Sequence, residues 1–269
     1  MSQDDLESRY WEAVELLDDG DPEGALELAE ALLEENPGDA DLLQVKGEAL
    51  RQLGDFEEAI ETFRSIVRAD PNDMDGRFYI VDTLIELGQL AEAEREMITI
   101  IERAPDFAGG YALRALLADI AGRDVEADED YQRASRLDDE MPVPQRLTHD
   151  DFSTVLEAAY ADIPDQFRAA FKNVSVSVRN FPPLDAVRDT SSPINMYALG
   201  YFDGVPLPDR TIDDPRSAMP AFVYIYKRNL ERTCDTREDL VEEVRITLLH
   251  ELGHFLGLDE DDMERLGLD

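Results

Sequence analysis

Two histidines stand four residues apart near the end of the chain, at His250 and His254, and Glu251 follows the first of them directly. Residues i and i+4 of an α-helix project from the same face, so both imidazoles can reach one ion. The alternative interpretation is a core helix whose two histidines are satisfied by hydrogen bonds, but burying that pair beside a glutamate is costly without a metal. The spacing therefore predicts a zinc site, with Glu251 as a general base that takes a proton from water.

A single long helix is predicted around these residues. Asp235 or Thr236 can cap its start, residues 237–256 carry it, and Gly257 fits the left-handed residue that often ends a helix. Its second half is apolar on most faces. We therefore expect the His-Glu-His face to lie at an opening of an otherwise dry core.

The rest of this half predicts a mixture of helices and strands. Residues 150–161 have helical spacing of apolar positions, with Thr148 as the cap. Alternating apolar positions predict strands at 174–178 and 221–226, and a short strand and turn within 197–204. These elements predict a small α+β domain.

The order of these elements resembles the bacterial mini-zincins, which are small zincin-like metallopeptidases. The resemblance spans residues 150–269 and is most specific at 248–264. The resemblance extends the strand that begins at residue 221 through the segment Val-Tyr-Ile-Tyr-Lys-Arg-Asn-Leu. It suggests that residues 222–226 line the cleft as an edge strand and pair with an extended peptide. Core packing explains the same alternation equally well. The resemblance implies a zinc-dependent peptidase.

The family motif HExxHxxGxxD maps onto His250, Glu251, His254, Gly257 and position 260. The resemblance thus implies that His250, His254 and residue 260 are the metal ligands. Here residue 260 is Glu260 instead of aspartate, one carbon longer but still able to coordinate zinc.

The residues alone leave the third ligand open. Only 15 residues follow His254, and none of them is a histidine. A turn after Gly257 is best placed to swing back to the metal, which favours Glu260 and then Asp259. The remaining candidates are Asp261, Asp262 and Glu264.

The first half of the sequence repeats every 34 residues. One register of the period consists of glycines, a second of alanines and a third of prolines: Gly20, Gly54, Gly88 and Gly122; Ala25, Ala59, Ala93 and Ala127; Pro37, Pro71 and Pro105. This pattern resembles tetratricopeptide repeats, in which two antiparallel helices meet at a small residue. The resemblance covers residues 6 to about 138 and implies a protein-interaction module.

These patterns predict an α-helical tetratricopeptide solenoid followed by a small α+β zincin-like domain. We place about four repeats at residues 1–140, a linker with two prolines at 141–149, and the zincin-like domain at 150–269. The single Cys234 excludes an internal disulfide. The sequence shows no basic, apolar leader and no apolar run long enough to cross a membrane, so we expect a cytoplasmic protein.

The formal net charge is −38, and residues 1–140 hold 39 acidic against 12 basic residues. Such a surface repels nucleic acid and anionic membranes and favours basic protein or peptide partners, although solubility alone also explains it. We expect a zinc metallopeptidase whose repeats recruit a partner or substrate. The alternative is an adaptor protein whose zincin-like domain binds zinc but is structural or weakly active. The substrate and the oligomeric state do not follow from the sequence.

Overall fold

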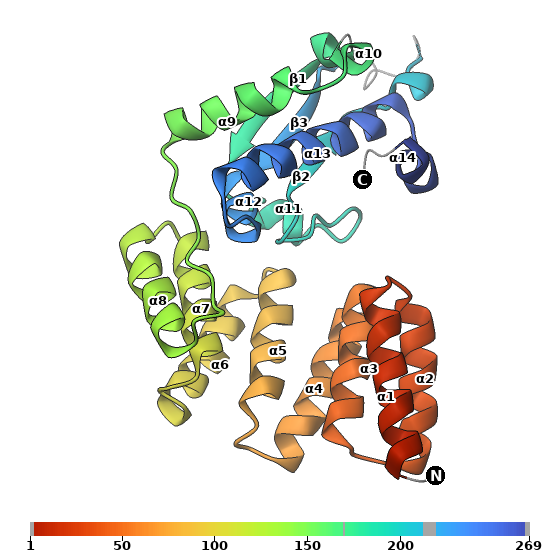
Figure 1. Cartoon of the computed structure of the whole chain (residues 1–269), viewed down its shortest axis with the longest axis vertical. Helices are drawn as coiled ribbons and strands as arrows, with labels where there is room; N and C mark the ends of the chain where they lie inside the picture. Colours follow the sequence, from red (N-terminus) through yellow and green to blue (C-terminus); the bar gives the residue numbers. More distant parts are fainter. Residues whose placement is uncertain (1–2, 169, 212–218, 267–269) are drawn as a thin grey trace. The chain divides into compact units, whose positions relative to one another are not determined.

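A computed structural model describes residues 3–168, 170–211 and 219–266 of the chain (Figure 1). It divides into two compact units, Met1–Met141 and Pro142–Asp269, which we describe separately. Within the described ranges, no helix combines the length and the apolar character needed to cross a membrane.

The first unit, called the repeat array here, is built from antiparallel helix pairs (Figure 1). The helices are α1 Gln3–Asp18, α2 Pro22–Glu35, α3 Ala40–Gln52, α4 Phe56–Ala69, α5 Met74–Glu86, α6 Leu90–Arg103, α7 Ala108–Ile120 and α8 Asp124–Leu137. Each helix packs on the next one along the chain. The predicted α-helical solenoid is confirmed.

The glycine register of the 34-residue period marks the turn inside each helix pair. Gly20, Gly54, Gly88 and Gly122 all have a positive φ, between 67° and 84°. Residues with a side chain are strained in this left-handed region, whereas glycine is not. The glycine period therefore arises because each of these turns needs a residue that adopts a positive φ without strain.

Close packing inside the pairs explains the small residues. The four alanines of the second register are fully buried. A Cβ added to Gly47 in α3 would lie 2.3 Å from the ring of Phe63 in α4, which stacks on Tyr79 of α5 at 5.1 Å between ring centroids. Helices of successive repeats thus share one continuous core.

The second unit contains a three-stranded sheet in the order β1-β3-β2. Strand β1 (Val174–Arg179) pairs in parallel with β3 (Ala221–Tyr226), and β2 (Gly200–Asp203) pairs with β3 in the antiparallel direction. The expectation that residues 222–226 form an edge strand is wrong. Both backbone edges of β3 are used by its neighbours, so core packing explains its alternation, and β2 lies at an edge instead.

Helices pack around this sheet (Figure 1). They are α9 His149–Ala161, α10 Asp165–Arg168, α11 Leu184–Val187, α12 Lys227–Thr233, α13 Arg237–Leu256 and α14 Glu260–Leu266, with 3-10 turns η1 Ala170–Asn173 and η2 Leu207–Asp209. Helix α13 packs against α9, β2 and β3. The predicted helices at 150–161 and 237–256 are confirmed, with side-chain caps from Thr148 and Thr236.

Helix α12 occupies residues that the resemblance assigned to a strand. Glu231 is fully buried, and its carboxylate accepts from Lys227 Nζ at 2.7 Å and from Arg228 at 2.9 Å. Side chains three and four residues apart are neighbours on a helix but lie far apart along a strand, so this ion pairing favours the helix. The same carboxylate accepts the Leu147 N–H at 2.9 Å, which holds the residues before α9 in the second unit.

Candidate metal centre

Helix α13 presents His250 and His254 on one face, as the spacing predicts. Their ring centroids lie 4.8 Å apart, with the ring planes at 87°, and both side chains are half-buried. The helix is fixed at both ends, by a capping box between Thr236 and Asp239 and by Gly257 at φ 79°. Two adjacent imidazoles on a rigid helix are a suitable donor pair for zinc.

Glu251 is buried beneath the first residue of β2. A Cβ added to Gly200 would lie 2.8 Å from both Cγ and Oε1 of Glu251, and 2.7 Å from Cγ2 of Thr247. The backbone of β2 can approach α13 this closely only because residue 200 is glycine. The strand therefore forms one wall around the carboxylate.

Two clefts meet at Glu251. The larger, of about 520 Å³, is lined by Tyr201, Phe202, Gly204, Pro206, Asp209, Glu251, His254, Gly257, Leu258 and Asp259. The smaller, of about 350 Å³, is lined by Ala198, Leu199, Gly200, Glu243, Ile246, Thr247, His250 and Glu251. Each cleft takes one histidine from α13 and a stretch of β2 or its approach. A substrate lying along β2 could therefore pass both histidines.

Two tyrosines near Glu251 were missed by sequence reasoning. Tyr201 of β2 lines the larger cleft together with Glu251 and His254. Burial raises the pKa of Tyr226 to about 12; the Arg179 guanidinium opposes this shift and the Glu251 carboxylate adds to it. Tyr226 thus remains a neutral phenol at physiological pH. The sequence predicts strands at both tyrosines, but it does not give the register, which sets Tyr201 opposite Tyr224 on β3.

Helix α14 begins at Glu260, the predicted third ligand. The side chain of Glu260, like those of Asp261 and Glu264, lies outside the described residues. Asp259 lines the larger cleft and caps α14, because its Oδ1 accepts the Asp262 N–H at 2.8 Å. Among the side chains that the structure describes, no three His, Cys, Asp or Glu gather closely enough to hold a metal. Glu260 stays a prediction.

Helix α14 is docked onto α13 beside the second histidine. Met263 is fully buried, and a Cβ added to Gly253 would lie 2.5 Å from its Sδ. The Met263 N–H also donates to the Asp259 carbonyl at 3.0 Å. The glycine before His254 therefore lets α14 pack closely on α13, next to Asp259, which lines the larger cleft.

Comparison with known families decides the class of both units. Residues 171–268 match the zincin-like metallopeptidase model, and residues 16–75 and 50–117 match a tetratricopeptide repeat model. The chain joins tetratricopeptide repeats to a zincin-like metallopeptidase domain. Both resemblances drawn from the sequence are thereby confirmed.

Solved structures similar to this chain include MamA and two tetratricopeptide repeat proteins. MamA (residues 41 to the end) from Desulfovibrio magneticus RS-1 is 25% identical with a TM-score of 0.43, covering 52% of this chain and 79% of its own. A thermophilic tetratricopeptide protein of Thermus thermophilus is 22% identical with a TM-score of 0.46, covering 50% and 75%. One from Parabacteroides merdae is 20% identical with a TM-score of 0.42, covering 50% and 54%. No curated protein matches the chain.

The donor set of the zincin-like domain suits zinc. The two imidazoles line accessible clefts, and the buried carboxylate of Glu251 borders both clefts. The arrangement therefore fits a zinc ion better than it fits a purely structural histidine pair.

Proposed function

We propose that the zincin-like domain is a zinc-dependent peptidase in which His250, His254 and Glu260 hold the metal and Glu251 is the general base. The observation that carries this proposal is the position of Glu251. Its buried carboxylate borders both clefts and follows the first of two imidazoles whose rings lie 4.8 Å apart. A base in this position reaches a water at the metal while staying shielded from bulk solvent.

Zinc bound here would polarise the scissile carbonyl and lower the pKa of the attacking water. Glu251 accepts the proton of that water and passes it to the leaving amine. The Glu251 side chain occupies the space that a Cβ at residue 200 would need, so glycine at this position leaves room for the proton acceptor. Tyr201, in the larger cleft, is the side chain we propose to donate a hydrogen bond to the carbonyl oxygen as charge develops on it.

Strand β2 is the element we propose to align the substrate. One edge of β2 pairs with β3, and its residues line both clefts beside α13. An extended peptide can add to the other edge through main-chain hydrogen bonds, which are independent of side-chain identity. The scissile bond would then lie beside Glu251.

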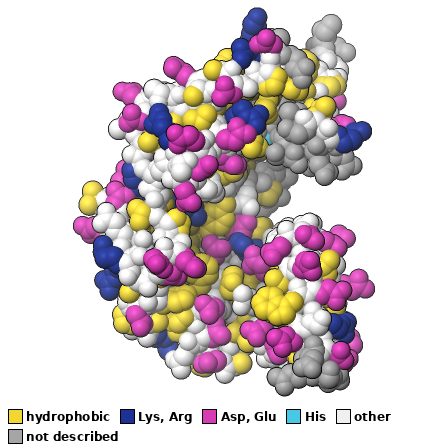
Figure 2. All heavy atoms as spheres, viewed as in Figure 1, with side chains coloured by type: hydrophobic (Ala, Val, Ile, Leu, Met, Phe, Trp, Pro, Cys, Tyr) yellow, Lys and Arg dark blue, Asp and Glu magenta, His cyan; other side chains and the backbone are white. Residues whose placement is uncertain are grey.

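We further propose that the repeats recruit a protein partner or substrate with basic segments, in the cytoplasm. Tetratricopeptide repeats commonly mediate protein–protein interaction. Acidic side chains are spread over the visible face of the array, with few basic ones among them (Figure 2). This charge attracts basic polypeptides and repels nucleic acid.

The test compares the wild type with Glu251→Gln, which keeps the size of the side chain and removes the base. We expect equal zinc content and a fall of roughly a hundredfold or more in peptide hydrolysis. Glu238→Gln, in the exposed first turn of the same helix, is the matched control and should leave hydrolysis unchanged. Full hydrolysis by Glu251→Gln contradicts the proposal, and zinc binding without cleavage of any peptide in a broad library assigns the domain a structural role.

A further inference from the structure

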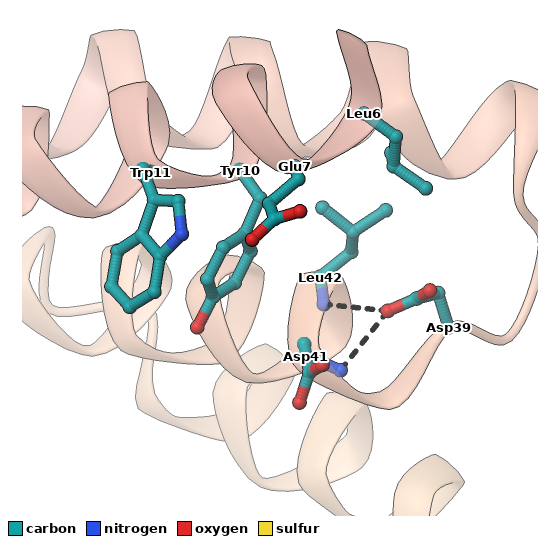
Figure 3. Close-up of a pocket in the computed structure, with 7 residues that line it drawn as sticks. All are labelled: Leu6, Glu7, Tyr10, Trp11, Asp39, Asp41 and Leu42. Atoms are coloured by element: carbon teal, nitrogen blue, oxygen red, sulfur yellow. Dashed lines mark hydrogen bonds between the residues drawn. The ribbon is translucent and has the colours of Figure 1, made fainter. Parts of the chain in front are cut away.

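A separate cleft of about 310 Å³ lies between α1 and the start of α3 in the repeat array (Figure 3). We call it the Tyr10–Trp11 cleft, and it is lined by Leu6, Glu7, Tyr10, Trp11, Asp39, Asp41 and Leu42. Figure 3 shows the two aromatic rings and Glu7 descending from α1 toward the carboxylates at the start of α3. No part of this cleft is needed for the proposed hydrolysis.

The aromatic surface of this cleft is unusually accessible. Trp11 is 59% exposed, although tryptophan is usually among the most extensively covered residues. Its ring meets Tyr10 edge-on, with centroids 5.1 Å apart and planes at 70°. An exposed indole face attracts cations through its π electrons, and the planar guanidinium of arginine stacks on it especially well.

The carboxylates of the cleft add a negative potential. Within the part of the chain that the structure describes, Glu7, Asp39 and Asp41 have no cationic partner. One oxygen of Asp39 caps α3 by accepting the N–H groups of Asp41 and Leu42, at 3.1 and 3.2 Å. Burial raises the pKa of Tyr10, and the negative charges of Asp41 and then Asp39 raise it further.

The next repeats show what a neutralised carboxylate cluster looks like in this array. Arg51 of α3 lies 3.0 Å from Asp82 and 3.0 Å from Glu86 of α5, and it also pairs with Glu48. There, one guanidinium from the chain itself satisfies the acidic groups. At the Tyr10–Trp11 cleft, the carboxylates are present without a guanidinium to occupy the space between them.

We propose that the Tyr10–Trp11 cleft binds a cationic side chain, arginine above all, of an extended basic segment in the partner protein. The guanidinium stacks on Trp11 and pairs with the three carboxylates of the cleft, those of Glu7, Asp39 and Asp41. This inference rests on the proposed recruiting role of the repeats and is independent of zinc and of peptide hydrolysis. It names the chemistry that the partner must carry.

Trp11 is the single tryptophan of the chain, so its fluorescence reports on this cleft directly. The full chain is titrated with a short peptide that alternates arginine and glycine, and with a twin in which neutral citrulline replaces each arginine. We expect a saturable change in fluorescence with the arginine peptide and binding weaker by about tenfold with the citrulline peptide, from the loss of the ion pairs and the cation–π contact. Equal binding of both peptides overturns the proposal.

Variants separate the cleft from the general acidity of the chain. Asp39→Asn removes a charge but keeps the cap on α3, because asparagine caps as well as aspartate, and it should weaken arginine-peptide binding by roughly threefold. Glu27→Gln removes an exposed charge of α2 outside the cleft and should have no effect. Trp11→Ala, read by the anisotropy of a labelled peptide, should weaken binding by roughly fivefold, whereas Val125→Ala, also an exposed apolar side chain, should not.

Equal effects of Asp39→Asn and Glu27→Gln, or of Trp11→Ala and Val125→Ala, would show diffuse attraction and overturn the proposal. Zinc content and hydrolysis of a small neutral peptide are measured on the same samples. A failure at the cleft with intact hydrolysis refutes this inference alone. A wild type that contains no zinc or hydrolyses no peptide refutes the proposed catalytic function. The peptide titration then still tests the Tyr10–Trp11 cleft.

Discussion

The repeat array and the zincin-like domain differ in how far apart in the sequence the residues that contact one another inside each unit are. In the array each helix packs on its neighbours in sequence, and one period of 34 residues describes turns and core together. In the zincin-like domain, the site joins Gly200 of β2, Glu251 of α13 and Met263 of α14. A change in the array should therefore be absorbed within neighbouring repeats, whereas one in the zincin-like domain should reach the site.

Buried charge differs between the two units in the same way. In the array, Arg51 pairs with three carboxylates, and its side chain is still partly exposed. In the zincin-like domain, Glu231 is fully buried and is the partner of both Lys227 and Arg228. In the first network three carboxylates surround one cation, whereas in the second one carboxylate contacts two buried cations.

The largest effect is therefore expected from Glu231→Gln, compared with Glu86→Gln in the array. The first substitution removes the negative charge that contacts both buried cations, Lys227 and Arg228, and should lower the free energy of unfolding of the zincin-like domain by about 3–5 kcal/mol. Burial already lowers the pKa of Lys227, so this lysine would tend to lose its proton in the variant. In Glu86→Gln, Arg51 keeps two carboxylates, and we expect a loss of about 1 kcal/mol.

Urea unfolding of both variants, followed by far-ultraviolet circular dichroism, measures this difference. The unfolding of the zincin-like domain is followed separately through the release of zinc. Equal losses of unfolding free energy in the two variants would contradict the comparison. They would show that Glu231 matters no more to its ion pairs than Glu86 matters to the Arg51 network.

A smaller effect on stability but a clear one on catalysis is expected from Gly200→Ala. The added methyl group would press on the Glu251 carboxylate and on Thr247, so we expect kcat to fall by roughly tenfold or more while the zinc content stays unchanged. Its counterpart in the array is Gly54→Ala, where φ is 84° and the backbone strain should cost about 1–2 kcal/mol of stability without changing kcat. Steady-state kinetics and zinc analysis of both variants measure this difference. An unchanged kcat in Gly200→Ala would show that the close approach of β2 to Glu251 does not matter for catalysis.

The smallest effect concerns alkaline pH. Because the pKa of Tyr226 is raised from 10.0 to about 12 in the folded domain, the folded state holds a proton that the unfolded chain releases. The resulting stabilisation is present below pH 10 and is lost as the pH rises from 10 to about 12. Tyr226→Phe should make the stability of the zincin-like domain less dependent on pH in this window. Identical pH profiles for the variant and the wild type would contradict the assignment.

The features that could be predicted from the sequence are local ones. The glycine period reports a backbone conformation that each turn requires. The bounds of α13 follow from the cap at Thr236 and the left-handed Gly257, both within one turn of the helix ends. The histidine pair follows from helical geometry alone, so its common face could be derived before any fold was known.

The features that could not be predicted depend on pairing between distant segments. Strand order made β3 central, although its alternation is the same as that of an edge strand. Helix α12 forms where a strand was expected, because the helix lets Lys227 and Arg228 pair with the buried Glu231. This burial depends on the tertiary fold. The contact of Gly200 with Glu251 spans some fifty residues, and no period or spacing carries that information.

The most direct test of the account is the zinc stoichiometry and affinity of the purified chain, with a competing chelator, in the wild type and three variants. We expect one zinc per chain, no binding in His254→Ala, and an affinity reduced by more than about a hundredfold in Glu260→Ala, beyond the usual effect of an outer-shell partner. Asp259→Asn keeps the cap on α14 and should bind zinc like the wild type. A folded wild type without zinc affinity, or zinc binding that survives His254→Ala, would contradict the account.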